Sequence, residues 1–216
     1  MKLELINKTA ILLFLLAGAM FLSAAGSETR SLAAPRMNGG KPLLQTLKER
    51  QSIREYVPDV LSDQQLSDLL WAAFGMNRPE IDHRTAPSAQ NTQDVDIYVV
   101  MAQGVFLYEA KPHQLKKVSD RDLRPLTSGQ PFAKIAPVQL VFVSDYARMP
   151  KVSPGLRDLY AGVDTGCIVQ NVYLFCASEN LASVVHELDR DPLAKALELR
   201  PDQHIVVAQT VGYAKK

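Results

Sequence analysis

The sequence lacks the short motifs of several large enzyme classes. No G-x-G-x-x-G follows a predicted strand and no G-x-x-x-x-G-K-[ST] is present, which excludes a standard dinucleotide-binding fold and a P-loop. There is no G-x-S-x-G to indicate a hydrolase. An excess of one charge is missing too, because 24 Lys and Arg residues stand against 23 Asp and Glu residues. Without a global basic field to hold nucleic acid, any anion site must be local.

Cysteine and histidine are scarce and scattered. The two cysteines, Cys167 and Cys176, fall nine residues apart in one predicted helix, which puts them on opposite sides and roughly 13 Å apart along its axis. They are therefore too distant for a mutual disulfide and are interpreted as buried small hydrophobes. None of the four histidines shares a helix face with another, so the sequence predicts no metal site. Capping of a helix by Asp191 explains the acidic pair Asp189 and Asp191 more simply than a metal or acid–base site does.

The N-terminus is typical of an export signal. Lys2 and Lys8 precede an uncharged apolar run over residues 9–25, and its last three residues form an acceptable small-residue cleavage site. We expect residues 1–25 to be a signal peptide, residues 26–41 a flexible leader, and residues 42–216 the folded domain. The expected location is outside the cytoplasm, in the periplasm if the source is bacterial. An uncleaved membrane anchor is the alternative.

Strands and helices interleave in the domain without regular alternation. Apolar runs predict strands over residues 96–103, 105–108, 138–145, 181–188 and 204–213. Helical spacing predicts a short helix around residues 43–47, one beginning at the N-cap Ser62, a long one over residues 155–178, and one over residues 192–199. Residues 113–126 are interpreted as short helical turns, and residues 77–93 as a long irregular connection. This order favours an α+β fold.

Two polar stretches carry the functional signal. If residues 49–56 (ERQSIREY) are extended, Arg50, Ser52 and Arg54 point to one side, and two guanidinium groups with a hydroxyl suit a phosphate. Solvated surface ion pairs are the alternative. Residues 84–93 (RTAPSAQNTQ) bring amides and small residues into a loop before a buried strand, which could approach a flat heterocycle or simply be a turn.

Together these stretches resemble the FMN-dependent nitroreductase family. The motifs that carry the resemblance keep the family's order from about residue 43 to residue 213: R-x-S-x-R-x-[FY] at 50–56, L-x-x-L-L-x-A-A-x-x-G-like LSDLLWAAFG at 66–75, P-S-x-x-N-x-Q at 87–93, a strand after Ala-Pro at 136–137, D-x-G-x-x-x-Q-N-x-x-L at 164–174, and V-G-Y at 211–213.

The resemblance implies a three-layer fold, in which helices flank a central mixed or antiparallel sheet, and a site for FMN. It places Arg50 and Ser52 at the phosphate and ribityl chain, Arg54 at the pyrimidine edge of the ring, and Asn91 at the ring edge. A cation at that edge would stabilise the negative charge of the reduced ring. The expected cofactor-binding set is Arg50, Gln51, Ser52, Arg54, Pro87, Ser88, Gln90, Asn91, Val185, His186 and Lys215, with Arg84 nearby.

Three positions depart from the family pattern. The family commonly has Q-P-W after the asparagine, whereas Gln93 is followed by Asp94 and Val95. Glycines are common after the strand that follows the long helix, where backbone N–H groups approach flavin N5. Here Val185 and His186 stand there, which would bring a titratable side chain to the reactive edge. Few residues follow the V-G-Y motif, so Lys215 is the candidate for a phosphate-binding base that members usually supply later.

By resemblance, the protein is expected to be a homodimer with FMN sites at the interface. It would pass hydride by a ping-pong reaction from NAD(P)H or another reductant to a nitro compound, quinone or enone, through flavin-borne chemistry and no protein catalytic dyad. Export makes the donor uncertain, because nicotinamides are scarce outside the cytoplasm. A flavin-dependent dehydrogenase of a modified peptide, in the manner of the peptide-azoline dehydrogenases, and a flavin-binding module without turnover are the alternatives.

Overall fold

The computed structural model describes residues 28–215. The predicted signal peptide lies outside these residues. The elements, in chain order, are β1 (Thr29–Ser31), α2 (Leu43–Glu49), β2 (Tyr56–Val57), α3 (Asp63–Phe74), β3 (Met76–Arg78), β4 (His83–Arg84), β5 (Val95–Met101), β6 (Gly104–Glu109), β7 (Gln114–Ser119), α4 (Phe132–Ile135), β8 (Val138–Asp145), α5 (Arg157–Ser178), β9 (Ala182–His186), α6 (Arg190–Ala196) and β10 (Gln203–Ala214).

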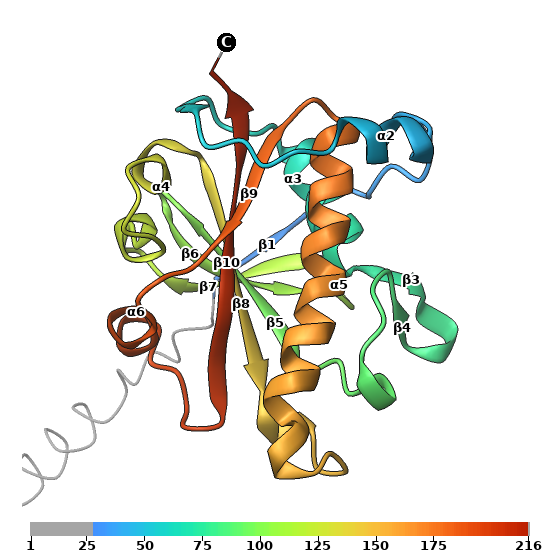
Figure 1. Ribbon diagram of the computed structural model, residues 1–216, viewed down its shortest axis with the longest axis vertical. Coiled ribbons are helices and arrows are strands. Elements are labelled where there is room, and N and C mark those ends of the chain that lie inside the picture. The colour runs from blue at the N-terminus through green and yellow to red at the C-terminus, as the bar shows by residue number, and fades with distance from the viewer. Residues whose placement is uncertain (1–27, 216) are drawn as a thin grey trace, which may run out of the picture.

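The centre of the molecule is an eight-stranded sheet in the order β1-β7-β6-β5-β8-β10-β2, with β9 also paired to β10. The strand pairings in this sheet are all antiparallel within the described residues, and the predicted α+β class is confirmed. Figure 1 shows α3 and α5 on one side of the strands and α4 and α6 on the other. The fold therefore has the three layers that the family resemblance implied.

Strand alternation divides the core between the two faces of the sheet. Ile97, Val99 and Met101 of β5 face α3 and α5 and join the larger apolar cluster. Tyr98 and Val100 point the other way and pack with residues of α6, such as Leu193. Since β5 and β8 are buried on both faces, their sequences are continuous apolar runs, which is why the sequence revealed them.

The cap of α3 forms as its sequence predicts. Ser62 accepts a hydrogen bond from the backbone N–H of Gln65, and the Gln65 side chain accepts from the N–H of Ser62, which completes a capping box. The cap of α6 differs. The helix begins at Arg190 with Asp189 in the N-cap position, without a side-chain cap, so the predicted capping role of Asp191 is wrong. Asp191 instead lies in the first turn, where a negative charge favours the helix dipole.

Three predicted segments adopt a different structure. Residues 114–119, predicted as helical turns, form β7, because their backbone pairs with β6 on one side and with β1 on the other. Residues 77–93 are not wholly irregular, since β3 and β4 form a small hairpin there. The predicted leader is part of the fold from residue 28 onward: Thr29–Ser31 pair with β7, and Arg36 donates to the buried Asp68 carboxylate at 2.6 Å.

Both cysteines were predicted to be buried, and the structure confirms this for Cys176 alone. Cys167 and Cys176 are both free thiols, with Cys176 buried and Cys167 half-buried. Within residues 28–215 no helix has the length and apolar character needed to cross a membrane.

Candidate flavin site

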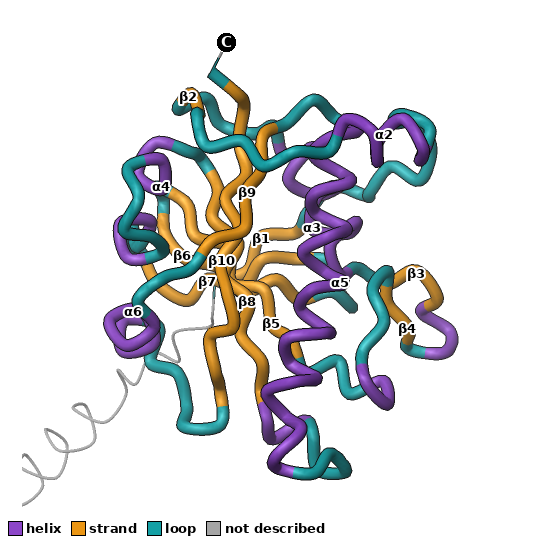
Figure 2. Tube along the Cα trace, viewed as in Figure 1, coloured by secondary structure: helices purple, strands orange, loops and turns teal. Residues whose placement is uncertain are grey.

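The chain between α2 and β2 forms one edge of the candidate site. We call residues 50–54, together with Val185 and Lys215 beside them, the arginine edge. In Figure 2 this connection is a loop that passes across the ends of β9 and β10. The N–H of Ile53 donates to the Ser183 carbonyl at 3.0 Å, and the N–H of Lys215 donates to the Glu55 carbonyl at 3.0 Å. Backbone contacts with both strands therefore hold this segment extended.

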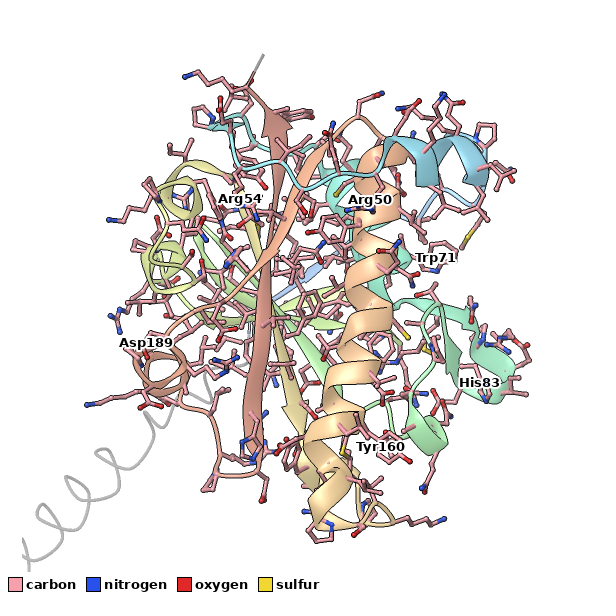
Figure 3. The ribbon with its side chains drawn as sticks, in the orientation of Figure 1. Arg50, Arg54, Trp71, His83, Tyr160 and Asp189 are labelled. Atoms are coloured by element: carbon pink, nitrogen blue, oxygen red, sulfur yellow. The ribbon has the colours of Figure 1, made fainter. Side chains whose placement is uncertain are left out.

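Side chains along the arginine edge alternate as the extended pattern predicts. Ile53 turns inward against the cluster around Tyr56 and Phe132. Ser52 and Arg54 are exposed and Arg50 is half-buried. Figure 3 shows Arg50 beside α5 and Arg54 further across the ends of the strands. Within the described part of the chain neither guanidinium makes a hydrogen bond or an ion pair, so their donors are available to a ligand.

Tyr173 of α5 connects three parts of the arginine edge. Its hydroxyl lies 3.0 Å from Ser52 Oγ and accepts a hydrogen bond from the Val185 N–H at 2.8 Å. The Arg50 guanidinium lies over its ring, 5.2 Å from the centroid. Sequence reasoning missed this residue, because a tyrosine on the inner face of a long helix reads as a core aromatic.

The structure corrects the expectation for β9. His186 is 8% exposed, its Nε2 lies 2.9 Å from Thr210 Oγ1, and its ring packs against Phe132. Burial lowers the pKa of His186, which keeps the ring neutral. Because side chains alternate along a strand, His186 points to the α4 face while Val185 points toward α5. The histidine therefore offers no titratable group at an open flavin edge, and the Val185 N–H is already donated to Tyr173.

The second candidate segment, residues 87–93, lies against the first half of α5, and we call it the amide loop. The N–H of Ala89 donates to Asp164 Oδ2 at 2.9 Å, and Ser88 Oγ accepts from the Gln93 N–H at 2.9 Å. Three non-glycine residues of the loop have φ near +50°, namely Gln90, Asn91 and Gln93. Left-handed backbone at such residues is uncommon and persists where surrounding contacts impose it.

Buried charge anchors the amide loop. Asp94, which stands where the family usually has proline, accepts hydrogen bonds from Thr92 Oγ1 at 3.0 Å and Ser144 Oγ at 2.6 Å. Burial raises the pKa of the Asp164 carboxyl to about 6, and the neighbouring Asp94 carboxyl adds to the rise by its charge and a hydrogen bond. The Ala89 N–H opposes this shift.

The arginines near the amide loop are committed to protein partners. Arg84 Nε donates to Gln93 Oε1 at 2.7 Å, and its guanidinium lies over the Phe74 ring at 4.3 Å. Arg148 pairs with Asp96 at 2.8 Å. These cations support the loop instead of presenting donors to a ligand, so Arg84 is a scaffold residue here.

One chain does not bring the two segments together. The amide loop contacts α5 at Asp164, and the arginine edge contacts it at Tyr173. Nine residues of helix separate these contacts, which is roughly 13 Å along the axis. Arg54 lies beyond Arg50, still further from the loop (Figure 3). Arg54 and Asn91, both assigned to the ring of the flavin, are therefore on opposite sides of a single protomer.

A cavity opens beside the arginine edge. Its volume is about 480 Å³, and its lining includes Arg50, Gln51, Tyr173 and Ser183 together with Lys41 and Lys48. In this lining the Arg50 guanidinium makes no hydrogen bond to the described residues, whereas the Lys41 ammonium is already held by Glu49, the Ala177 carbonyl and Asn180. The free guanidinium, the Lys48 ammonium and the exposed Ser52 hydroxyl of the same segment are groups that can hold a phosphate monoester. The residues present therefore fit the phosphate end of FMN. Among residues 28–215 no cluster of His, Cys, Asp or Glu is arranged to hold a metal ion.

Comparison with known protein families places the chain among nitroreductases. The model described as "Nitroreductase family" matches residues 47–213, from just before the arginine edge to the end of the V-G-Y motif. A protein of Methanocaldococcus jannaschii named "Putative nitroreductase" is 32% identical over 148 residues, which cover 64% of this chain and 74% of that protein.

Solved structures share the fold. A crystal structure from Ralstonia eutropha, also titled a putative nitroreductase, superposes with a TM-score of 0.84 at 37% identity and covers 89% of this chain and 92% of that one. A chain of the Escherichia coli microcin synthetase complex superposes with a TM-score of 0.68 at 16% identity, covering 93% and 86%. The NADPH:FMN oxidoreductase of Vibrio harveyi superposes with a TM-score of 0.59 at 19% identity, covering 81% and 69%. The last two show likeness of fold alone.

Proposed function

Because the chain belongs to the nitroreductase family of oxidoreductases, we propose that it is an FMN-dependent enzyme that reduces a small nitro, quinone or enone acceptor. Bound FMN would supply the redox chemistry, accepting hydride from NAD(P)H or another reductant and passing it on. The protein's part is to bind, orient and charge-stabilise the cofactor. This division agrees with the lack of a nucleophile–base pair among the predicted site residues.

The proposal is supported mainly by the arginine edge, where the guanidinium groups of Arg50 and Arg54 make no hydrogen bond or ion pair within the described residues. Arg50 and Ser52 are positioned to hold the phosphate and ribityl chain, with the Lys215 backbone tied to the same segment at Glu55. Arg54, further across the ends of the strands, is positioned to offer positive charge to the ring. A cation at that place favours negative charge on the reduced ring and so favours reduction.

We further propose a homodimer, because the ring-facing residues Arg54 and Asn91 can share a ligand only if the amide loop comes from a second copy. The exposed face of α5 is suited to such contact. Leu159 and Val163 are 58% and 53% exposed, and Gly162, Gly166 and Gln170 continue the same face at helical spacing. A Cβ built on either glycine meets nothing within 4 Å, so another backbone could approach closely there.

The same face of α5 supports one geometry for the proposed dimer. Most homodimers have two-fold symmetry, and a two-fold axis near the middle of α5 packs the two copies of the helix antiparallel. That operation sets the Asp164 level of one helix beside the Tyr173 level of the other. The amide loop of one copy then lies next to the arginine edge of its mate, which completes two equivalent sites.

The test is the visible spectrum of the purified protein, recorded with and without added FMN and again after anaerobic NADH or NADPH. A flavin spectrum that bleaches with either nicotinamide supports the enzyme and opens an acceptor screen with nitro compounds and quinones. A colourless protein that also fails to bind added FMN contradicts the proposal, whatever its oligomeric state.

A second candidate function is a flavin-dependent dehydrogenase of a modified peptide. The β3–β4 hairpin favours it, because Asn77 and Arg78 are exposed beside the amide loop and could contact an extended substrate. Flavin that is bleached by a heterocycle-precursor peptide and not by nicotinamides would support this function. Flavin that binds tightly and is reduced by neither would indicate a binding module without turnover.

A further inference from the structure

The hydroxyl of Tyr173 is the junction between two parts of the chain far apart in sequence. Ser52 and Tyr173 are 121 positions apart, and Val185 lies 12 positions further on, yet one oxygen contacts both. Tyr173 is 7% exposed and belongs to the main apolar core, so its ring is held by packing. A fixed ring carries a fixed hydroxyl, and the position of that hydroxyl determines where Ser52 and the outer edge of β9 lie.

Proton accounting fixes the direction of one of the two bonds. The Val185 N–H can only donate, so the Tyr173 oxygen accepts from it. The bond between Tyr173 and Ser52 can run either way, and we assign the tyrosine as its donor because Ser52, the exposed partner, can then turn its own proton to a ligand. Ser52, having accepted, keeps its own O–H free. Because Ser52 is exposed, that O–H is available to a ligand at the arginine edge.

Resting on the proposed function, we propose that Tyr173 is a positioning residue for the flavin, which orients the free O–H of Ser52 and fixes the outer edge of β9 through one hydroxyl. The Arg50 guanidinium also packs over the Tyr173 ring, with its central carbon 5.2 Å from the ring centroid. Three of the groups assigned to the cofactor thus depend on one side chain that does not itself need to touch it. We call the chain of contacts from the Val185 N–H through the Tyr173 hydroxyl to Ser52 the tyrosine relay. In this relay the Val185 N–H donates to Tyr173 and not to the flavin.

The test uses Tyr173→Phe, which keeps the ring for the core and for Arg50 and removes only the hydroxyl. We expect the Kd for FMN to rise roughly tenfold, since two hydrogen bonds are lost and the Val185 N–H is left unpartnered. Riboflavin, which lacks the phosphate, should lose affinity by a similar factor, because the Arg50 support remains. Tyr146→Phe is the matched control: its hydroxyl contacts Asp158 at the far end of α5. Unchanged affinities in Tyr173→Phe would overturn the proposal.

A double-mutant cycle separates positioning from general stability. If Tyr173 acts through Ser52, then Ser52→Ala should cost little further affinity in the Tyr173→Phe background, whereas fully additive losses contradict the relay.

Amide hydrogen exchange tests the relay in protein without flavin. We expect exchange at Val185 to accelerate at least tenfold in Tyr173→Phe and to stay unchanged in Tyr146→Phe. An unaltered Val185 rate overturns the relay. If the wild-type protein binds no FMN, the proposed function fails, and the exchange rate still decides whether the hydroxyl holds the edge of β9.

Discussion

The arginine edge and the amide loop are built in opposite ways. Neutral groups position the arginine edge, namely backbone carbonyls and the Tyr173 hydroxyl, and its guanidinium donors are left unspent. Ionisable groups position the amide loop, through Asp94, Asp164 and Arg84, while the side-chain amides of Asn91 and Gln93 donate to the Asp82 carbonyl. The first region is prepared to receive an anion. The second is a shaped surface that rests on the buried carboxylates Asp94 and Asp164.

The difference predicts how each region fails. Loss of one donor at the arginine edge should weaken ligand binding without much change in fold stability, because exposed cations contribute little to folding. A change in charge under the amide loop should alter stability itself, because an uncompensated buried charge is costly. Variants in the two regions, together with one at the helix face that would unite them, test this contrast.

The largest effect is expected at the face of α5. In Gly166→Arg a long charged side chain occupies the space proposed for a second copy. We expect a dimer to become a monomer in light scattering and to lose FMN, since each site would lack its partner's amide loop. In a monomer the change is harmless, because the glycine faces open space and arginine is the better helix former. Gly129→Arg, equally unobstructed, is the control. A variant that stays dimeric and retains flavin would refute this use of α5.

The next largest effect is expected from Arg50→Gln. The guanidinium can make charge-assisted hydrogen bonds to a phosphate, each worth about 1.5–3 kcal/mol, so FMN affinity should fall roughly 10- to 100-fold. Riboflavin affinity and the melting temperature should change little. Arg78→Gln, at an exposed arginine of the β3–β4 hairpin, provides the comparison. Equal losses for FMN and riboflavin, measured by flavin fluorescence, would mean that Arg50 does not bind the phosphate.

The regular elements could be predicted where the signal is local. The strands β5, β8 and β10 are long apolar runs, and the capping box of α3 lies within four residues. β1 escaped prediction because its partner β7 lies 80-odd residues away in the chain. β7 pairs with the adjacent β6, but it is a short, polar strand without a clear apolar run. Short polar edge strands have no pattern that separates them from turns.

The same limit explains which site residues were found. Arg50, Ser52 and Arg54 form a compact motif, so sequence suggested a shared surface and the structure gives them one edge. Tyr173 was missed because its partners come from two other elements. The acid pair was missed because Asp94 and Asp164 are 70 positions apart. The inward turn of His186 follows from the phase of β9, which a single apolar run does not reveal.

An intermediate effect, and one specific to the amide loop, is expected from Asp164→Asn. The folded pKa of Asp164, about 6, lies above the value of 3.8 for a free side chain. Its stabilising contribution is therefore complete below about pH 4 and is lost as pH rises through 6. At pH 8 the ionised Asp164 carboxylate should lower the free energy of unfolding by about 1–2 kcal/mol, after allowance for solvent screening. The charged groups near it are the Asp94 side chain and Arg148, which donates to the Asp94 carbonyl.

Asparagine does not titrate, so the melting temperature of Asp164→Asn should be higher than that of the wild type at pH 8 and similar to it at pH 5. Thermal melts across that range measure it. The lowered pKa values of His113 and His186 oppose the trend, because neutral histidine in the fold favours stability above about pH 6.5. The comparison between variants cancels their effect. Asp59→Asn, at an exposed carboxylate, should leave the profile unchanged. If the melting temperatures of wild type and Asp164→Asn change with pH in the same way, ionisation of Asp164 does not affect the stability of the amide loop.

The smallest effect is expected from Lys215→Gln, and it sharpens the description of the arginine edge. Lys215 is exposed, and its backbone N–H donates to the carbonyl of Glu55, the residue that follows Arg54. An exposed ammonium near a phosphate contributes about 0.2–1 kcal/mol, so FMN affinity should fall up to about fivefold and more steeply at low ionic strength. Lys195→Gln, on α6, controls for net charge. If Lys215→Gln weakens FMN binding but leaves riboflavin binding unaffected, the C-terminal end of the chain supplies a second cation to the phosphate beside Arg50. If it weakens neither, Arg50 and Ser52 hold the phosphate without help from the chain end.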